Sequence, residues 1–231
     1  MVNVAGVAGC VSLKSLRLYL VTDQASCRGR TLSDVVALAV QGGVTCVQLR
    51  EKTLNTRDFV AQAMVMKTLL APHGIPLVIN DRIDVALACG AQGVHLGQSD
   101  MPVAQARRLL PSHMFIGWSV ETMEDVVRSA SLPVDYLGVS PIHATSTKTD
   151  TAAPWGLEGL RRVRAETNLP LVAIGGIHLG NAREILAAGA EGLALVSALC
   201  AAPDPRATAQ AFRALMEGDL SSNSVCAGRT L

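Results

Sequence analysis

Short apolar runs recur along the chain, and longer stretches with helical spacing of apolar and polar residues separate them. Most of these runs are continuously apolar, which is typical of parallel strands that are buried on both faces. The pattern therefore predicts a parallel sheet rather than a sheet with one face in water. The eight predicted strands begin near Leu16, Cys46, Leu77, Gly93, Phe115, Tyr136, Leu171 and Gly192.

Amphipathic stretches follow the apolar runs and predict a helix after each strand. Thr31 suits the N-cap of the first helix, and Pro102 suits the first turn of the fourth. Gly90 and Gly189 suit helix exits, because glycine readily adopts the left-handed conformation that ends many helices. The predicted helices span 32–41, 56–70, 81–89, 102–110, 122–130, 157–167, 181–188 and 204–216.

Eight strand–helix units in 231 residues are close to the ~250 residues of a typical (β/α)₈ barrel. Glycine-rich helix exits at 41–45 and 188–192 support the repeat. The alternative is an open doubly wound sheet, but no G-x-G-x-x-G motif follows the first strand. We therefore predict a single α/β domain, a (β/α)₈ TIM barrel over residues 14–217, with flexible tails at 1–13 and 218–231.

Composition narrows the classes of function. Hydrophobic residues make up 49% of the chain and aromatic residues only 3%, so the core is expected to be aliphatic. The formal net charge is +1 and no basic run is interleaved with aromatic residues, so we expect no nucleic acid partner. No apolar stretch reaches the ~18 residues of a membrane helix. The six cysteines lack C-x-x-C spacing, which disfavours a zinc site or disulfide framework and favours a reducing cytoplasm.

Polar residues stand at the C-terminal ends of the predicted strands, where the active sites of such barrels form. This end of the barrel would bring together groups from seven of the strands. The residues at these positions are Gln48, Arg50, Lys52, Asn80, Asp81, Gln98, Ser99, Asp100, Ser119, Thr145, Thr147, Lys148, Gly175, Gly176, Val196 and Ser197.

Three of these loops suit phosphate. The loop at 145–148 combines three hydroxyls with Lys148, and hydroxyls, backbone N–H groups and a cation together bind phosphate. Gly175 and Gly176 let the backbone approach a ligand, and Ser197 offers an N–H and a hydroxyl after the eighth strand. The loops after strands seven and eight often form a phosphate site in this fold. The alternatives are a solvated polar loop and two ordinary tight turns.

Two acids and three cations would meet at one rim of the barrel, namely Asp81, Asp100, Arg50, Lys52 and Lys148. Two carboxylates beside a phosphate repel it unless a cation lies between them, and magnesium is the usual hard cation for such ligands. Each acid also has a plain alternative role, because Asp81 could start a helix and Asp100 could cap one. The set predicts a magnesium-bound pyrophosphate beside a separate phosphate monoester. No serine–histidine–acid set or reactive cysteine is visible, so catalysis would come from positioning and leaving-group stabilisation.

Five segments of the chain resemble thiamine-phosphate synthase, in the order of that family. They are QLREK at 48–52, INDR at 79–82, GVHLGQSDMP at 93–102, GVSPI with TSTK between 138 and 148, and IGGI at 174–177. The resemblance covers about residues 16–217. It implies a cytoplasmic transferase that joins a hydroxymethylpyrimidine pyrophosphate to a thiazole phosphate. The products would be thiamine phosphate and pyrophosphate, formed through a carbocation-like transition state.

The resemblance also assigns residues to each ligand. It implies that the pyrimidine pyrophosphate is bound by Gln48, Leu49, Arg50, Glu51, Lys52, Asn80, Ser119 and Lys148. The expected catalytic residues among them are Arg50, Lys52, Ser119 and Lys148. The thiazole phosphate would be bound by Thr145, Ser146, Thr147, Gly176, Val196 and Ser197. One Mg²⁺ per subunit would be bound by Asp81 and Asp100.

One position departs from the family pattern. The family commonly reads Gly-x-Ser-x-His after the fifth strand, whereas Glu121 stands at the histidine position here, which bears on the geometry of that loop. We expect His95 to be a satisfied core residue, Trp118 to be a packing residue and His143 to be a lesser site candidate.

Two alternatives share the barrel. A thiazole tautomerase relative would lack the full metal and pyrophosphate set. A non-catalytic barrel that binds thiazole phosphate or thiamine phosphate would not need both the acids and the cations. The sequence leaves the oligomeric state open, although small barrels of this kind often pair.

Overall fold

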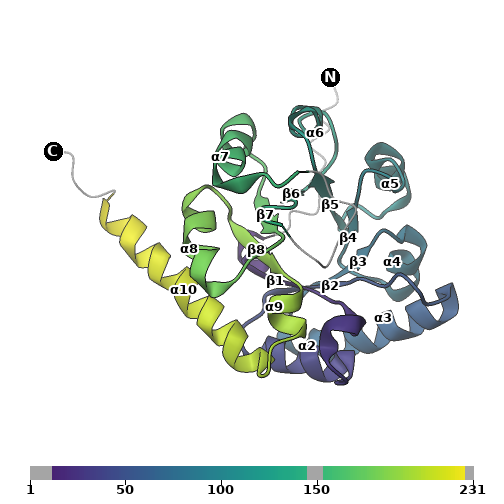
Figure 1. Cartoon of the computed structure of the whole chain (residues 1–231). Helices are drawn as coiled ribbons and strands as arrows, with labels where there is room; N and C mark the ends of the chain where they lie inside the picture. Colours follow the sequence, from purple (N-terminus) through teal and green to yellow (C-terminus); the bar gives the residue numbers. More distant parts are fainter. Residues whose placement is uncertain (1–11, 145–152, 227–231) are drawn as a thin grey trace.

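The computed structural model describes residues 12–144 and 153–226, with side chains described up to Gly218. Eight parallel strands form a closed barrel in the order β1 to β8, and β1 pairs with β8 to close it (Figure 1). The prediction of a (β/α)₈ TIM barrel is confirmed. The strands are β1 Leu18–Val21, β2 Cys46–Leu49, β3 Leu77–Asn80, β4 Gly93–Leu96, β5 Phe115–Val120, β6 Tyr136–Val139, β7 Leu171–Ile174 and β8 Gly192–Leu195.

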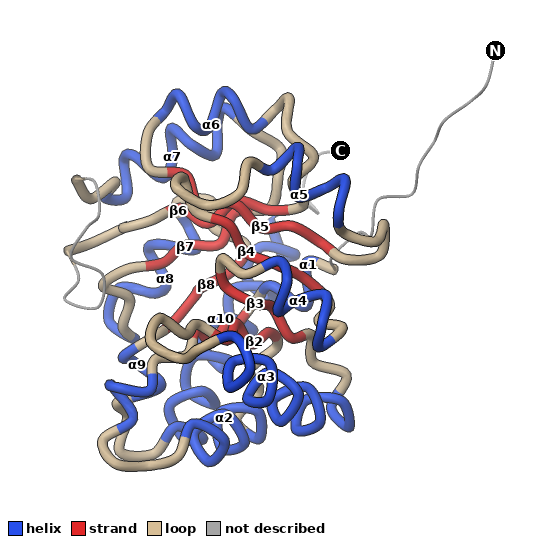
Figure 2. The backbone as a smooth tube through the Cα atoms, turned by 90° about the vertical axis from the view of Figure 1, so that its right-hand side faces the viewer, coloured by secondary structure: helices blue, strands red, loops and turns tan. Residues whose placement is uncertain are grey.

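Helices surround the strands, as Figures 1 and 2 show from two directions. No helix in the described ranges is both long enough and apolar enough to cross a membrane. The described α-helices are α1 Leu13–Leu16, α2 Leu32–Gln41, α3 Thr56–Leu70, α4 Ile83–Cys89, α5 Val103–Leu109, α6 Met123–Ser129, α7 Gly156–Glu166, α8 Leu179–Ala187, α9 Ser197–Cys200 and α10 Pro205–Cys226. Two 3₁₀ helices, η1 Gln24–Cys27 and η2 Ala71–His73, lie in the loops.

The first strand and the C-terminal end of the domain differ from the prediction. Leu16 belongs to helix α1, which Ser12 caps, so the first strand begins at Leu18. Helix α10 continues to Cys226, and the expected domain end at residue 217 therefore falls inside a helix. No proline interrupts the segment after Pro205, and its polar composition alone suggested a tail. Helix α10 packs against α2 and α8 and so completes the ring of helices.

Side chains on each strand alternate between the barrel interior and the layer beneath the helices. On β5, Phe115 packs in the interior cluster and Trp118 in the outer one. Gly117 faces inward, and a Cβ there would lie 2.1 Å from Cζ of Tyr136. Because Gly117 has no side chain, the barrel interior has room below the mouth for the ring of Tyr136. This alternation decides which strand-end residues reach the site.

Candidate active site

A cavity of about 550 Å³ opens at the C-terminal ends of the strands, and all eight strands contribute to its wall. This volume lies in the range that holds a small-molecule ligand. Most strand-end residues singled out from the sequence line it. They are Gln48, Arg50, Lys52, Asn80, Asp81, Gln98, Ser99, Asp100, Ser119, Gly175, Gly176, Val196 and Ser197.

Two carboxylates stand together at the mouth of this cavity. Asp81 follows β3, and Asp100 lies in the loop after β4. Burial raises the pKa of the Asp100 carboxyl above its usual value, and direct interaction with the Asp81 carboxyl raises it further, against a hydrogen bond from the Gly97 N–H. The Asp81 and Asp100 carboxylates therefore lie at the same part of the cavity mouth, as predicted. Among the described residues, no group of three or more histidine, cysteine or acidic side chains could hold a metal ion.

The backbone at Asp81 aims its carboxylate at the mouth. Its φ of 64° is left-handed, a conformation that aspartate tolerates better than most residues. The Asp81 N–H donates to the His95 carbonyl at 2.9 Å, and the Arg82 N–H donates to the Asn80 carbonyl at 2.8 Å. Helix α4 begins only at Ile83, so the predicted start at residue 81 is wrong. Asp81 lies in a turn and is not the first residue of the helix.

Cations face the two acids. Lys52 Nζ lies 2.5 Å from Asp81 Oδ2, although its side chain is 54% exposed. An ion pair so open to water contributes little to stability. Lys52 could therefore exchange Asp81 for a phosphate ligand at little cost in free energy. Arg50 also lines the cavity, and its backbone N–H donates to Thr22 Oγ1 at 3.0 Å. Lys148 and the hydroxyls of Thr145, Ser146 and Thr147 lie outside the described residues.

The structure does not bring Leu49 and Glu51 to the cavity. Leu49 is fully buried in the outer layer. Glu51 Oε1 instead accepts hydrogen bonds from the Lys52 and Thr53 N–H groups at 2.8 and 2.9 Å. Burial alone would raise the pKa of Glu51, but hydrogen bonds from Thr53 and its neighbours bring it below the usual value. The alternation along β2 explains this placement, because Gln48 and Arg50 face inward and the side chains of Leu49 and Glu51 face away.

A chain of hydrogen bonds crosses the floor of the cavity. Gln48 Nε2 donates to the Tyr19 hydroxyl at 3.0 Å, which lies 3.0 Å from the Tyr136 hydroxyl. The Tyr136 hydroxyl is 2.9 Å from Nδ1 of His95, and Nε2 of that histidine is 2.9 Å from Ser119 Oγ. Burial raises the pKa of both tyrosines well above the usual value, so both hydroxyls stay protonated. The chain therefore links two residues expected to bind the pyrimidine pyrophosphate.

Three members of this floor were not found as site residues from the sequence. His95 is hydrogen-bonded at both ring nitrogens, as expected of a satisfied residue, yet it also lines the cavity. Tyr19 and Tyr136 lie within apolar runs and read as core. The only signal was the tyrosine hydroxyl itself, because a buried hydroxyl needs a partner. Trp118 packs in the outer layer as predicted, and His143 does not line this cavity.

The opposite wall is formed by tight backbone turns. Gly175 and Gly176 have φ values of 101° and 64°, which strongly favour glycine. A Cβ at Gly176 would also lie 2.9 Å from the Ala144 carbonyl oxygen. Val196 and Ser197 line the same wall at the start of α9. Among the described residues, this wall presents backbone groups and one hydroxyl to the cavity, without the charged groups of the acid-lined side.

A family model described as thiamine monophosphate synthase matches residues 18–199 of the chain. The chain belongs to the thiamine monophosphate synthase family. Its activity is the synthesis of thiamine phosphate from small-molecule substrates, which makes it a transferase. The family assignment agrees with a barrel whose mouth combines acids, cations and a separate uncharged wall.

Relatives of the synthase support this assignment. The chain is 76% identical over 217 residues to the thiamine-phosphate synthase of Albidiferax ferrireducens, covering 94% of this chain and 99% of that one. It is 49% identical to the thiamine-phosphate synthase of Vibrio campbellii, covering 88% and 100%. A solved thiamine phosphate pyrophosphorylase from Pyrococcus furiosus superposes with a TM-score of 0.83 at 36% identity, covering 90% and 98%. These similarities favour the synthase over the tautomerase and carrier alternatives.

In this synthase, replacing Tyr136 with Phe should lower the free energy of unfolding by about 1–3 kcal/mol, because the Tyr19 hydroxyl and His95 Nδ1 each lose a buried partner. It should also lower kcat, because His95 is no longer held against Ser119. Tyr19→Phe is the comparison variant, because it leaves the Tyr136–His95 bond in place. It removes the hydroxyl that Gln48 contacts, so its effect should fall on the KM for the pyrimidine substrate. Urea denaturation and steady-state kinetics would measure both effects. An equal loss of kcat in the two variants would contradict a role through His95.

Proposed function

We propose that pyrophosphate leaves the pyrimidine substrate at the acid-lined side of the cavity while the thiazole phosphate is bound against the opposite wall. The observation that carries this proposal is that Asp81 and Asp100 both line the mouth of the cavity, where Lys52 pairs with Asp81. Two adjoining carboxylates would repel a pyrophosphate, whereas a cation between them would attract it. The mixture of charges is therefore what a metal-bound leaving group requires.

Magnesium fits this part of the chain. The Asp81 and Asp100 carboxylates would hold one Mg²⁺ per subunit, because a divalent cation would offset the repulsion between the two acids. Two protein ligands are enough, because magnesium takes its other ligands from water and substrate phosphates. The bound ion would neutralise charge on the departing pyrophosphate.

The chain's own cations and donors would bind the rest of the pyrophosphate. Arg50 and Lys52 face the cavity from the end of β2, and the Asn80 amide and Ser119 hydroxyl add neutral donors. Lys148 joins them by the family resemblance. Donors fixed in place before the reaction stabilise a developing negative charge without reorganisation. These residues would therefore promote departure of the leaving group.

No residue on the described wall is arranged as a nucleophile. No cysteine in the described part of the chain lines the cavity, and burial raises the pKa of the Cys46 thiol well above its usual value. Ser119 does contact His95, but the other ring nitrogen of that histidine faces the Tyr136 hydroxyl rather than a carboxylate. This supports a carbocation-like transition state, in which the electron-rich aminopyrimidine carries the developing positive charge. Gln48, on the floor, would orient the pyrimidine.

The uncharged wall would bind the thiazole phosphate. Gly176, Val196 and Ser197 face the cavity with backbone groups and one hydroxyl. Thr145, Ser146 and Thr147 are assigned to the same phosphate by the family resemblance. This arrangement would direct the thiazole nitrogen towards the pyrimidine methylene when pyrophosphate departs. We also propose that the enzyme acts in the cytoplasm, without a nucleic acid or membrane partner.

The experiment mixes the purified protein with both substrates and Mg²⁺. We expect equal amounts of thiamine phosphate and pyrophosphate, measured by chromatography and by a coupled pyrophosphate assay. A chelator should stop the reaction, and added Mg²⁺ should restore it. Turnover that persists in the chelator would contradict the magnesium assignment. Binding of both substrates without turnover would instead contradict the assigned roles in catalysis.

A further inference from the structure

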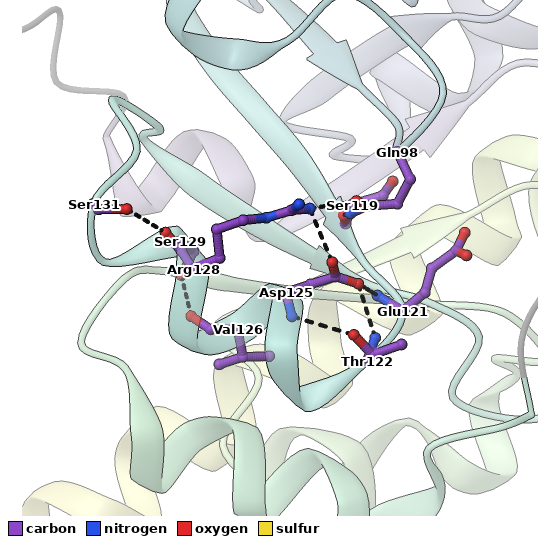
Figure 3. A network of polar contacts seen from close by, with 9 residues as sticks. All are labelled: Gln98, Ser119, Glu121, Thr122, Asp125, Val126, Arg128, Ser129 and Ser131. Carbon is purple, nitrogen blue, oxygen red and sulfur yellow. Dashed lines mark hydrogen bonds and ion pairs between the residues drawn. The ribbon is translucent and has the colours of Figure 1, made fainter.

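A polar network around Arg128 lies beside the cavity, and no substrate is assigned to it (Figure 3). Arg128 is on helix α6, and its guanidinium carbon lies 4.9 Å from the centroid of the Trp118 ring. Its Nη2 donates to Gln98 Oε1 at 2.7 Å and to Asp125 Oδ1 at 3.0 Å. Although 55% of this side chain is exposed, its guanidinium has three defined contacts.

Gln98 connects the arginine to the cavity wall. It lies in the loop after β4, and its Nε2 donates to the Ser119 carbonyl oxygen at 2.6 Å. A guanidinium can only donate hydrogen bonds, so the amide oxygen of Gln98 must face Arg128. The amide nitrogen must then face Ser119, as Figure 3 shows. Arg128 therefore fixes the orientation of the Gln98 amide.

The bond from Gln98 to Ser119 joins the loop after β4, which carries Asp100, to strand β5, which carries Ser119. Asp100 lies two positions after Gln98, and its Oδ2 accepts the Gly97 N–H at 2.6 Å, which holds this loop together. Ser119 Oγ contacts His95 at the cavity floor. The position of Asp100 relative to the Ser119 hydroxyl therefore depends on the Gln98 bridge.

Asp125 fixes the other side of the network. Its Oδ2 accepts the N–H groups of Glu121 and Thr122 at 3.1 and 3.0 Å. Thr122 Oγ1 accepts the Asp125 N–H at 3.2 Å, so the two residues form a capping box at the start of α6. Figure 3 shows Asp125 between Arg128 and the turn that follows Ser119. Arg128, the helix start and this turn are therefore one connected unit.

We propose that Arg128 is a positioning residue that orients Gln98 and thereby holds the Asp100 loop against Ser119. Its effect is on the affinity for magnesium pyrophosphate, so this inference rests on the proposed function. A purely structural role would be an exposed ion pair with Asp125 within α6, and such pairs contribute little. The two roles differ because only the first one acts through Gln98.

The test is a double-mutant cycle with Arg128→Ala, Gln98→Met and the double variant. Methionine matches the length of glutamine and removes both hydrogen bonds. Isothermal titration calorimetry with Mg²⁺ and pyrophosphate should show about a tenfold weaker affinity in each single variant, as for other residues that support metal ligands. The double variant should also be about tenfold weaker, because both changes break the same bridge. The KM for thiazole phosphate should stay unchanged.

Two further variants separate positioning from folding. Arg161→Ala removes an equally exposed arginine, which pairs with Glu158 three positions away on α7, and it should leave the pyrophosphate affinity unchanged. Arg128→Lys keeps the charge but loses the planar fork, so it should recover only part of the affinity. Losses that multiply to about a hundredfold in the double variant would overturn action through Gln98. If Arg128→Ala bound magnesium pyrophosphate as tightly as the wild type, and the wild type still required Mg²⁺, the role of Arg128 would be overturned. If the wild type itself did not require Mg²⁺, the proposed function would be overturned.

Discussion

Replacing Asp100 with Asn should lower kcat/KM by about 10²–10³-fold, the range for loss of one preorganised electrostatic group. Asparagine has the same shape, and its side-chain oxygen can still accept the Gly97 N–H, so the loop should keep its conformation. What is lost is one of the two negative charges proposed to hold Mg²⁺. Steady-state kinetics over a range of Mg²⁺ concentrations would measure the loss.

The same variant should not be less stable than the wild type. Burial and the neighbouring Asp81 raise the pKa of Asp100, so ionised Asp100 costs more free energy in the folded protein than in the unfolded chain. A neutral side chain removes this unfavourable term, and the Tm of the variant should be equal or higher. Added Mg²⁺ and pyrophosphate should raise the Tm of the wild type but not that of Asp100→Asn, because ligands stabilise only the folded state that binds them.

Asp84→Asn is the matched control for this prediction. Asp84 is an exposed acid on α4 whose partner is Arg82, and it does not line the cavity. Its replacement should change kcat/KM by no more than about twofold, as expected of a surface charge. A comparable loss in Asp84→Asn, or full activity in Asp100→Asn, would contradict the metal assignment.

Replacing Lys52 with Met should lower kcat by about 10²-fold, because a cation that stabilises the leaving pyrophosphate is removed. Methionine keeps an unbranched apolar side chain of similar length. The Lys52 side chain of the Lys52–Asp81 ion pair is 54% exposed, so loss of the pair should change the Tm little. The KM for thiazole phosphate should be unchanged, since that substrate is assigned to the opposite wall. Steady-state kinetics with each substrate varied in turn would separate these effects.

Two comparisons test the charge itself. Lys52→Arg should retain much of kcat, because it keeps the positive charge at the mouth. Lys14→Met, which removes an exposed lysine on α1, should have no effect on kcat. If Lys52→Met weakened thiazole phosphate binding as much as it lowered kcat, its assignment to the pyrophosphate would be wrong.

The sequence predicted the site best where charged residues follow the end of a strand. Arg50, Lys52, Asp81 and Asp100 all line the cavity as expected, because the end of an apolar run marks the rim of a barrel. The alternation of the strand divides the family motif that follows the second apolar run. QLREK reads as one motif, but Leu49 and Glu51 lie away from the cavity.

The cavity floor and its supporting network could not be predicted in the same way. The Tyr19 and Tyr136 hydroxyls meet across the barrel from positions 117 residues apart. The Arg128 side chain on α6 meets the Gln98 side chain in the loop after β4, although the two are 30 residues apart in the sequence. These contacts depend on strand register, on the stagger of the barrel and on which rotamer each side chain adopts. A pattern of apolar and polar residues reports none of these.

The sequence by itself determined the barrel, the order of its units and the chemistry available at its mouth. Continuous apolar runs can be buried only between two layers, and the residue at which each run stops can be identified without coordinates. The tertiary structure alone decided that His95 and two tyrosines form the floor, that Leu49 and Glu51 face away, and that Arg128 reaches the site through Gln98. The physical reason is that burial depends on periodicity along the chain, whereas a hydrogen bond depends on the positions of two groups in space.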